Sequence, residues 1–191
     1  MYSLIVDSST KILYISLVKD NEIIFEKYVE GKNDHAKNIV STINEALTIN
    51  NINVDNLNKI IVGNGPGSYT GVRMAVTVAK MMATFKNVEL YTVSTLKLMA
   101  SGYNGVVVAS IDARRGNAFA AVFDLDNNQE LLSEGMYSYD MLNQYEGIKV
   151  NENEFKVNPI YCINNCEKVL EPHLLVPNYL RDTEAERNLK W

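Results

Sequence analysis

Apolar and polar residues follow clear periods along the first half of the chain, and these periods predict its helices and strands. Two stretches alternate apolar and polar residues on either side of Lys19-Asp20-Asn21, as the strands of a hairpin do. A helical period follows, which Asn33 or Asp34 can cap. The expected elements are strands at residues 3–7, 12–18 and 22–29, a helix at about 34–49, a strand at 59–63, a helix at 72–85, a strand at 91–93 and a helix ending near 101.

The second half repeats this order in a shorter form. A strand at 107–112 precedes a hairpin around Asp126-Asn127-Asn128 and a short helix at 139–145, and Asp112 lies 105 residues after Asp7. An α/β duplication with an aspartate at the end of each first strand resembles the actin-like ATPase fold, in which two acidic turns face a nucleotide cleft. We expect an N-terminal lobe at residues 1–102 and an abbreviated C-terminal lobe at 103–191. The residues expected to face a phosphate are Asp7, Ser9, Thr10 and Asp112; the alternative for both aspartates is ordinary capping at a strand end.

A glycine-rich stretch joins the strand at 59–63 to the next helix. Glycines tolerate the positive φ angles of a sharp strand-to-helix turn, and free N–H groups at a helix start suit an anion or a close protein contact. Gly71 is followed by Val72 and not by the Lys-Ser/Thr pair of a Walker loop, and Ser68 stands where a dinucleotide fingerprint needs glycine. We therefore interpret the stretch as a structural loop; its members are Gly65, Pro66, Gly67, Ser68 and Gly71.

The helix at 72–85 is apolar around most of its circumference. Its polar residues form one narrow stripe, and Ala75, Ala79 and Ala83 form a row at spacing four. A helix that covers one face of a sheet needs a single apolar stripe, so the excess indicates either a central place in the fold or a partner surface. Arg73 near the helix start opposes the helix dipole, and we expect it to pair with a carboxylate of this chain or of a partner, or else to be solvated.

Composition narrows the functional classes. The chain has 191 residues, a net charge of -5 and no basic run, so we expect no autonomous binding of nucleic acid. Neither a signal peptide nor an apolar run of membrane-spanning length is present, and a cytoplasmic protein is expected. Cys162 and Cys166 lack a second pair of ligands, so they are interpreted as ordinary thiols. No cofactor or metal is expected.

Five segments in order resemble the bacterial TsaB (YeaZ) family. They are residues 7–10 (DSST), 65–73 (GPGSYTGVR), 93–96 (VSTL), 111–114 (IDAR) and 177–181 (PNYLR). The resemblance implies a two-lobed actin-like fold and a role in making threonylcarbamoyladenosine beside the tRNA anticodon. It implies a non-catalytic subunit that binds and activates the TsaD transferase, that is joined by the TsaE ATPase, that forms homodimers alone, and that meets tRNA only through the complex. The implied partner interface comprises His35, Ile39, Ile43, Val72, Arg73, Met74, Ala75, Val76, Ala79, Met82 and Ala83.

The residues themselves also favour a non-catalytic protein. The catalytic relative carries His-x-x-x-His for a metal, and two histidines at spacing four share one helix face. Here His35 is followed four residues later by Ile39, so no metal site is expected. Bulky Arg114-Arg115 stands where a phosphate turn needs small residues. The alternatives are an actin-like small-molecule kinase or ATPase, and a metallopeptidase, which the missing second histidine opposes.

Overall fold

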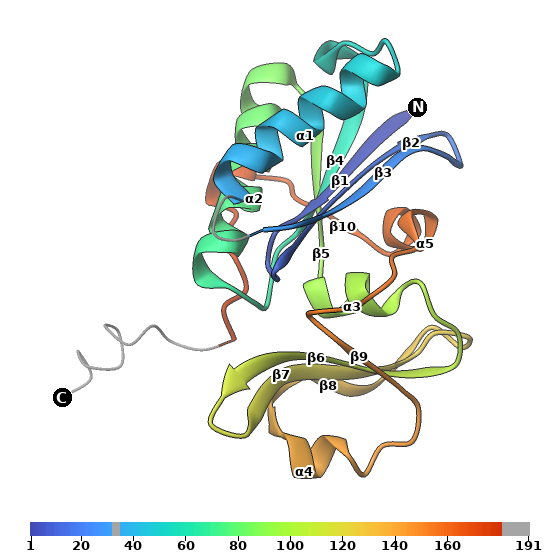
Figure 1. Ribbon diagram of the computed structural model, residues 1–191. Helices are drawn as coiled ribbons and strands as arrows, with labels where there is room; N and C mark the ends of the chain where they lie inside the picture. The colour runs from blue at the N-terminus through green and yellow to red at the C-terminus, as the bar shows by residue number, and fades with distance from the viewer. Residues whose placement is uncertain (32–34, 181–191) are drawn as a thin grey trace, which may run out of the picture.

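The computed structural model describes residues 1–31 and 35–180, which form ten strands and five α-helices together with two short 3-10 helices (Figure 1). The first half contains β1 (Tyr2–Asp7), β2 (Ile12–Lys19), β3 (Glu22–Glu30), α1 (His35–Ile49), η1 (Val54–Asn56), β4 (Leu57–Gly63), α2 (Tyr69–Lys86), β5 (Glu89–Val93) and α3 (Thr95–Ala100). The second half contains β6 (Val106–Arg114), β7 (Asn117–Asp124), β8 (Gln129–Ser138), α4 (Tyr139–Leu142), β9 (Ile148–Asn151), α5 (Pro159–Asn164), β10 (Glu167–Lys168) and η2 (Pro172–Leu174).

The two sheets repeat one topology. In the first sheet, of order β10-β5-β4-β1-β2-β3, β1 pairs antiparallel with β2 and parallel with β4. In the second, of order β8-β7-β6-β9, β6 pairs antiparallel with β7 and parallel with β9. This shared pattern is the duplication that the sequence predicts, with the 15-residue α1 replaced by the four-residue α4.

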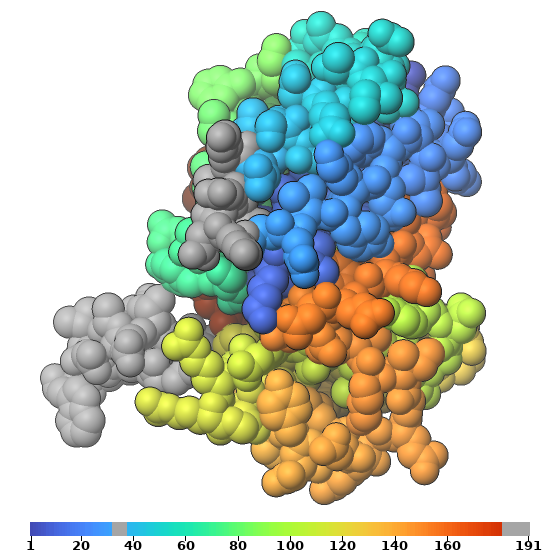
Figure 2. Space-filling view, viewed as in Figure 1, coloured from blue at the N-terminus to red at the C-terminus, as the bar shows by residue number. Residues whose placement is uncertain are grey.

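Three apolar clusters hold the layers together. Helices α1 and α2 cover one face of the first sheet, on Leu4, Val6 and their neighbours. The other face, with Ile5 and Ile61, packs through α3 and residues 155–162 onto the inner face of the second sheet. The outer face of the second sheet carries a smaller cluster under Leu142 of α4. Figures 1 and 2 show the resulting upper and lower lobes, and the two meet through the second cluster.

Helix α2 begins three residues earlier than predicted, because Ser68 is its N-cap. The Ser68 hydroxyl accepts the Gly71 N–H at 3.3 Å and so satisfies a donor that the first turn leaves free. Ser94 caps α3 in the same way, as expected. The caps predicted for α1, Asn33 and Asp34, lie outside the described residues.

The chain returns to the first lobe after β9. Strand β10 pairs with β5 at the edge of the first sheet, and the backbone N–H of Val169 donates to Leu90 O at 2.9 Å. The sequence pattern predicts neither β9, α5 nor this return, and it assigns all residues after 103 to the second lobe. The lobe boundary between residues 102 and 103 remains a prediction. The structure shows in addition that the chain crosses back to the first sheet at β10.

Candidate functional site

The glycine-rich loop packs against three other segments of the chain. Ser68 N donates to Ser9 O at 2.7 Å, Thr95 N donates to Gly65 O at 2.9 Å, and Asn178 N donates to Asn64 O at 2.7 Å. A Cβ on Gly67 would lie 2.2 Å from Ser9 O, and one on Gly65 would lie 2.4 Å from Asn178 O. The glycines are therefore needed for close backbone approach within the fold. Several of the loop's N–H groups are used internally, which weakens the phosphate-loop alternative.

Asp7 lies beneath this loop and is buried, with 1% of its surface exposed. Its Oδ1 accepts the Ser9 N–H at 2.7 Å, and its Oδ2 accepts the Thr95 hydroxyl at 2.6 Å and the Ser9 hydroxyl at 3.3 Å. Burial raises the pKa of Asp7, and the hydrogen bonds from Thr95 and Ser9 oppose that shift. The prediction that Asp7 faces a phosphate needs correction, because this carboxylate joins β1 to α3 inside the first lobe.

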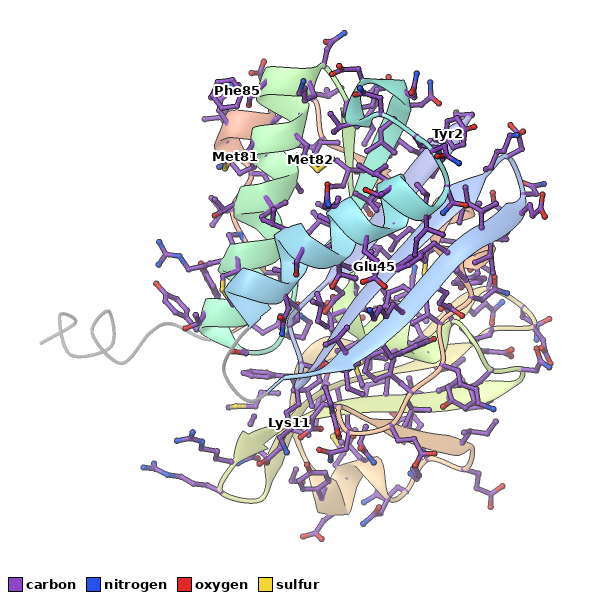
Figure 3. All side chains as sticks on the ribbon, turned by 45° about the horizontal axis from the view of Figure 1, so that its top comes forward. Tyr2, Lys11, Glu45, Met81, Met82 and Phe85 are labelled. Carbon is purple, nitrogen blue, oxygen red and sulfur yellow. The ribbon has the colours of Figure 1, made fainter. Side chains whose placement is uncertain are left out.

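A cleft of about 890 Å³ lies between the two lobes. The first lobe contributes Ser9, Thr10 and Lys11 with the start of α2, and the second contributes the β6–β7 turn and Glu152. Lys11 also bridges the lobes, because its Nζ donates to Asn153 Oδ1 at 3.0 Å. Figure 3 shows Lys11 where the first lobe meets the second sheet.

Asp112 is the aspartate that lines the cleft, and it is exposed. Its Oδ1 accepts the Arg114 N–H at 3.0 Å, and its own N–H donates to Glu152 Oε2 at 3.3 Å. Arg114 and Arg115 have φ angles of +67° and +55°, a left-handed conformation that holds them at the hairpin tip. The cleft thus carries cations and carboxylates on one wall and residues 9–11 of the first turn on the other. Whether these groups meet a phosphate stays a prediction.

The inward face of α2 belongs to the core of the first lobe. Six residues predicted for a partner interface are buried there: Ile39, Ile43, Val72, Ala75, Val76 and Ala79. Ile39 and Ile43 belong to α1. The other four belong to α2, where the sequence could not separate inward from outward residues because that helix is apolar nearly all round. The placement of these six on a partner surface is therefore corrected: they pack on this chain's own sheet.

The outward face of α2 is apolar as well. Met81 is 54% exposed and Phe85 is 76% exposed, while Met74, Met82 and Ala83 are half-buried. Figure 3 shows Met81 and Phe85 pointing away from α1, and Met82 on the side of α2 that faces α1. A pocket of about 400 Å³ between the helices is lined by Ile39, Tyr69, Thr70, Arg73, Met74, Thr77 and Val78. The predicted interface includes Met74, Met82 and Ala83 but lacks Met81 and Phe85.

Arg73 lies at the rim of this pocket. Its NH1 donates to the Tyr69 hydroxyl at 2.6 Å, and its guanidinium lies 5.1 Å from the centre of the Tyr69 ring. Among residues 1–31 and 35–180, no carboxylate forms an ion pair with Arg73. We expect Arg73 to pair with a carboxylate of this chain or of a partner. The described part of this chain does not supply that carboxylate.

The remaining residues singled out in the sequence are His35, Cys162 and Cys166. His35 begins α1, but its side chain lies outside the described residues. Cys162 is buried, and burial raises its pKa to about 12, so its thiol is a poor nucleophile. Within the described ranges no group of three His, Cys, Asp or Glu side chains gathers as metal ligands, and no helix is long and apolar enough to cross a membrane.

Two lobes of one topology, with an aspartate at the end of each first strand and a cleft between them, define an actin-like fold. Among solved structures, YeaZ from Pseudomonas aeruginosa matches with a TM-score of 0.76 over 94% of this chain and 99% of that one, at 18% identity. Residues 29–157 match the family model "TsaD: tRNA N6-adenosine threonylcarbamoyltransferase".

Two bacterial relatives share the sequence more closely. The tRNA threonylcarbamoyladenosine biosynthesis protein TsaB of Bacillus subtilis is 32% identical over 130 residues, which cover 66% of this chain and 57% of the relative. TsaB of Escherichia coli is 31% identical over 133 residues, with 67% and 57% covered. The chain therefore belongs to the TsaB (YeaZ) family, within the wider group that the TsaD model describes. The match spans little more than half the length of these relatives.

Proposed function

We propose that this chain is a non-catalytic subunit needed for threonylcarbamoyladenosine modification of tRNA, and that it binds and activates a TsaD-type transferase. The observation that carries the proposal is the outward face of α2. Met81 and Phe85 are largely exposed there although each is apolar, and the inward face already fills the core. Exposed apolar surface of this kind is typical of protein contact sites.

The interior of the cleft supports a non-catalytic role. Asp7, the acidic residue of the first turn, is sealed from the cleft by Ser9 and Thr95. The loop above it uses the N–H groups of Gly65, Ser68 and Gly71 within the chain. Groups that hold one another in the ground state are not free to hold a transferring phosphoryl group.

The surface available to the partner differs from the predicted one. We propose that it consists of Val40 on α1, Arg73 at the rim of the pocket, Met74 and Val78 in its lining, and the exposed Met81 and Phe85 of α2. A second copy of this chain would use the same face when the partner is absent. A TsaE-type ATPase would join the pair, and tRNA would be met only through the complex, as the net charge of -5 favours.

Light scattering tests the proposal directly. The chain is mixed with the TsaD-type subunit of the same organism, with and without ATP, and the mass of the product is measured. We expect a heterodimer to replace a homodimer, and Met81→Glu to weaken association about tenfold or more, as for a central interface residue. The matched control is Leu131→Glu on β8, where the side chain is 46% exposed. A mixture that stays unassociated in both conditions would contradict the proposal.

A small-molecule kinase or ATPase is the second candidate, and the cleft itself favours it. Lys11, Arg114 and Arg115 line a space of about 890 Å³ next to Asp112. Saturable ATP turnover by the pure chain that Asp112→Ala abolishes would support this function. Turnover that survives Asp112→Ala would come from a contaminant or from another site.

A further inference from the structure

The last described segment of the chain runs beside α2 on the side away from α1. We call residues 169–180 the strap. The strap leaves the first sheet where Val169 N donates to Leu90 O at 2.9 Å, close to the end of α2. Midway, Lys80 Nζ on α2 donates to His173 O at 2.9 Å and to Leu175 O at 3.0 Å. Figure 1 shows the strap on the far side of α2 from α1.

The other end of the strap is fixed at the start of α2. The Tyr179 ring stacks on the Tyr69 ring with 4.9 Å between centroids, and Asn178 N donates to Asn64 O at 2.7 Å. The strap therefore runs antiparallel to α2 and is tied to it near both ends and at the middle. Since α2 has 18 residues, the two run together over about 27 Å at 1.5 Å per residue.

The side chains of the strap divide into two sets. Val169 and Leu175 are half-buried and pack against the core of the first lobe. Leu170, Leu174 and Val176 point outward, with exposed fractions of 83%, 67% and 68%. The inner set explains how the strap is held in place, but nothing in the described fold covers the outer set. The 3-10 helix η2 within the strap packs against α2, and Figure 3 shows Met81 and Phe85 on the side of α2 away from α1, where the strap runs.

The charged residues near this surface indicate which kind of partner segment would complement it. Lys80 is occupied by strap carbonyls, and Lys86 pairs with Asp55 at 2.9 Å. On the strap itself, the exposed Glu171 lies 3.6 Å from His173 Nε2. Arg73 is the cation of the outward face whose hydrogen-bond partner in the described residues is the Tyr69 hydroxyl. An occupant that is mainly apolar and carries one carboxylate near Arg73 would complement the surface, because an arginine binds a carboxylate in a bidentate fashion.

We propose that the strap and the outward face of α2 form one docking surface, and that the TsaD-type partner lays an apolar helix across both. The partner helix would contact Phe85, Met81 and Leu174 and would place an acidic side chain opposite Arg73. This inference rests on the proposed function, and it adds the strap to the surface that binds the partner. It also assigns a role to the family-like segment at residues 177–180, which fixes the strap on the loop and on Tyr69.

Binding measurements on four proteins test the proposal. The strap variant carries Leu170→Asp with Leu174→Asp, the helix variant carries Met81→Asp, and the control carries Leu131→Asp; the wild type is the reference. The dissociation constant for the TsaD-type subunit is measured by calorimetry. We expect the strap and helix variants each to raise it about tenfold or more and the control to change it less than about twofold. Melting temperatures close to the wild type will show that each variant is folded, because the altered side chains are exposed.

The outcomes separate this inference from the function on which it rests. A helix variant that loses affinity while the strap variant binds like the wild type would overturn the role of the strap and leave the proposed function standing. A wild type that does not bind the TsaD-type subunit would overturn both. Strap substitutions that weaken only the homodimer would identify the occupant as a second copy of this chain, against the proposal. Rescue of Arg73→Glu by a charge-reversed partner helix would support the orientation.

Discussion

The first turns of the two lobes end their strands in the same way but differ in structure. Asp7 and Asp112 occupy equivalent places in equivalent sheets, yet Asp7 is 1% exposed and Asp112 is open to the cleft. The difference comes from what covers each turn. Gly63 has no Cβ, and one placed there would lie 1.6 Å from Asp7 Oδ2, so the neighbouring strand closes over the carboxylate. The two lobes thus share the same strand pattern around the aspartate, but the segments packed beside each aspartate determine whether its carboxylate is buried or exposed.

The second turn has no such cover. It continues into a hairpin whose residues Arg114, Arg115 and Gly116 all have positive φ angles, and a Cβ on Gly116 would meet nothing within 4 Å. In the described part of the second lobe, no segment covers the second turn as the glycine loop and α3 cover the first turn. The carboxylate of the first turn is therefore structural, and the carboxylate of the second turn is open to the cleft.

Removing the two carboxylates should separate these roles with the largest effect. Asp7→Ala leaves the buried Ser9 N–H without its acceptor, and an unpaired buried donor costs about 1–3 kcal/mol. It also removes the charged acceptor of the Thr95 and Ser9 hydroxyls, which then have only each other at 3.0 Å. We expect a loss of about 3 kcal/mol in the free energy of unfolding, measured by urea denaturation. Asp112→Ala should change it by less than about 0.5 kcal/mol, as for an exposed side chain. Equal losses would show that the two turns are alike after all.

Adding one methyl group at Gly71, which packs on the first turn, and one at Gly116, in the second turn, should give a smaller difference. A Cβ on Gly71 would lie 2.0 Å from Ser8 O, whereas Gly116 has open space but a φ of +75°. We expect Gly71→Ala to cost about 2–3 kcal/mol through overpacking and Gly116→Ala about 1 kcal/mol through backbone strain. Thermal unfolding monitored by circular dichroism measures both. A Gly71→Ala protein as stable as the wild type would mean that the loop can move away from the first turn.

The regular parts of both lobes were predictable from the sequence, and the parts that depend on tertiary contacts were not. The strands of the hairpin around Asp20 appear close to the predicted bounds, and the second hairpin forms around Asn127 as predicted. Strand β9 has four residues and β10 has two, too few for a period to be read. Burial also escaped prediction: Val6-Asp7 and Ile111-Asp112 form the same local pattern, and only the fold shows that Gly63 and Thr95 enclose the first aspartate.

The same limit applies to α2. Ala79 and Met81 are both apolar and two positions apart, yet Ala79 is fully buried and Met81 is 54% exposed. The helix is apolar on nearly every side, so its sequence period could not show which side meets the sheet. The order of strands and the position of the strap settle that orientation, and both arise from residues far away in the sequence.

The dependence of stability on pH tests the cover over the first turn, and its effect should be the smallest of those predicted here. Burial raises the pKa of Asp7 above its ordinary value of 3.8, so the folded state holds its proton more tightly than the unfolded state. Stability from this group is therefore full below pH 3.8 and is lost as the pH rises through the folded pKa. Other groups act in both directions, because burial also raises the pKa of Glu134 while hydrogen bonds lower the pKa values of Asp20 and Asp124.

The informative quantity is thus the difference in unfolding free energy between the wild type and Asp7→Asn, measured with urea across a pH series that begins below 3.8. We expect the destabilisation caused by Asp7→Asn to be largest at the acid end and to shrink as the pH rises, because the wild type alone loses the contribution of this carboxyl. A flat difference for Asp7→Asn would mean that the cover over the first turn leaves the proton affinity of this carboxyl unchanged.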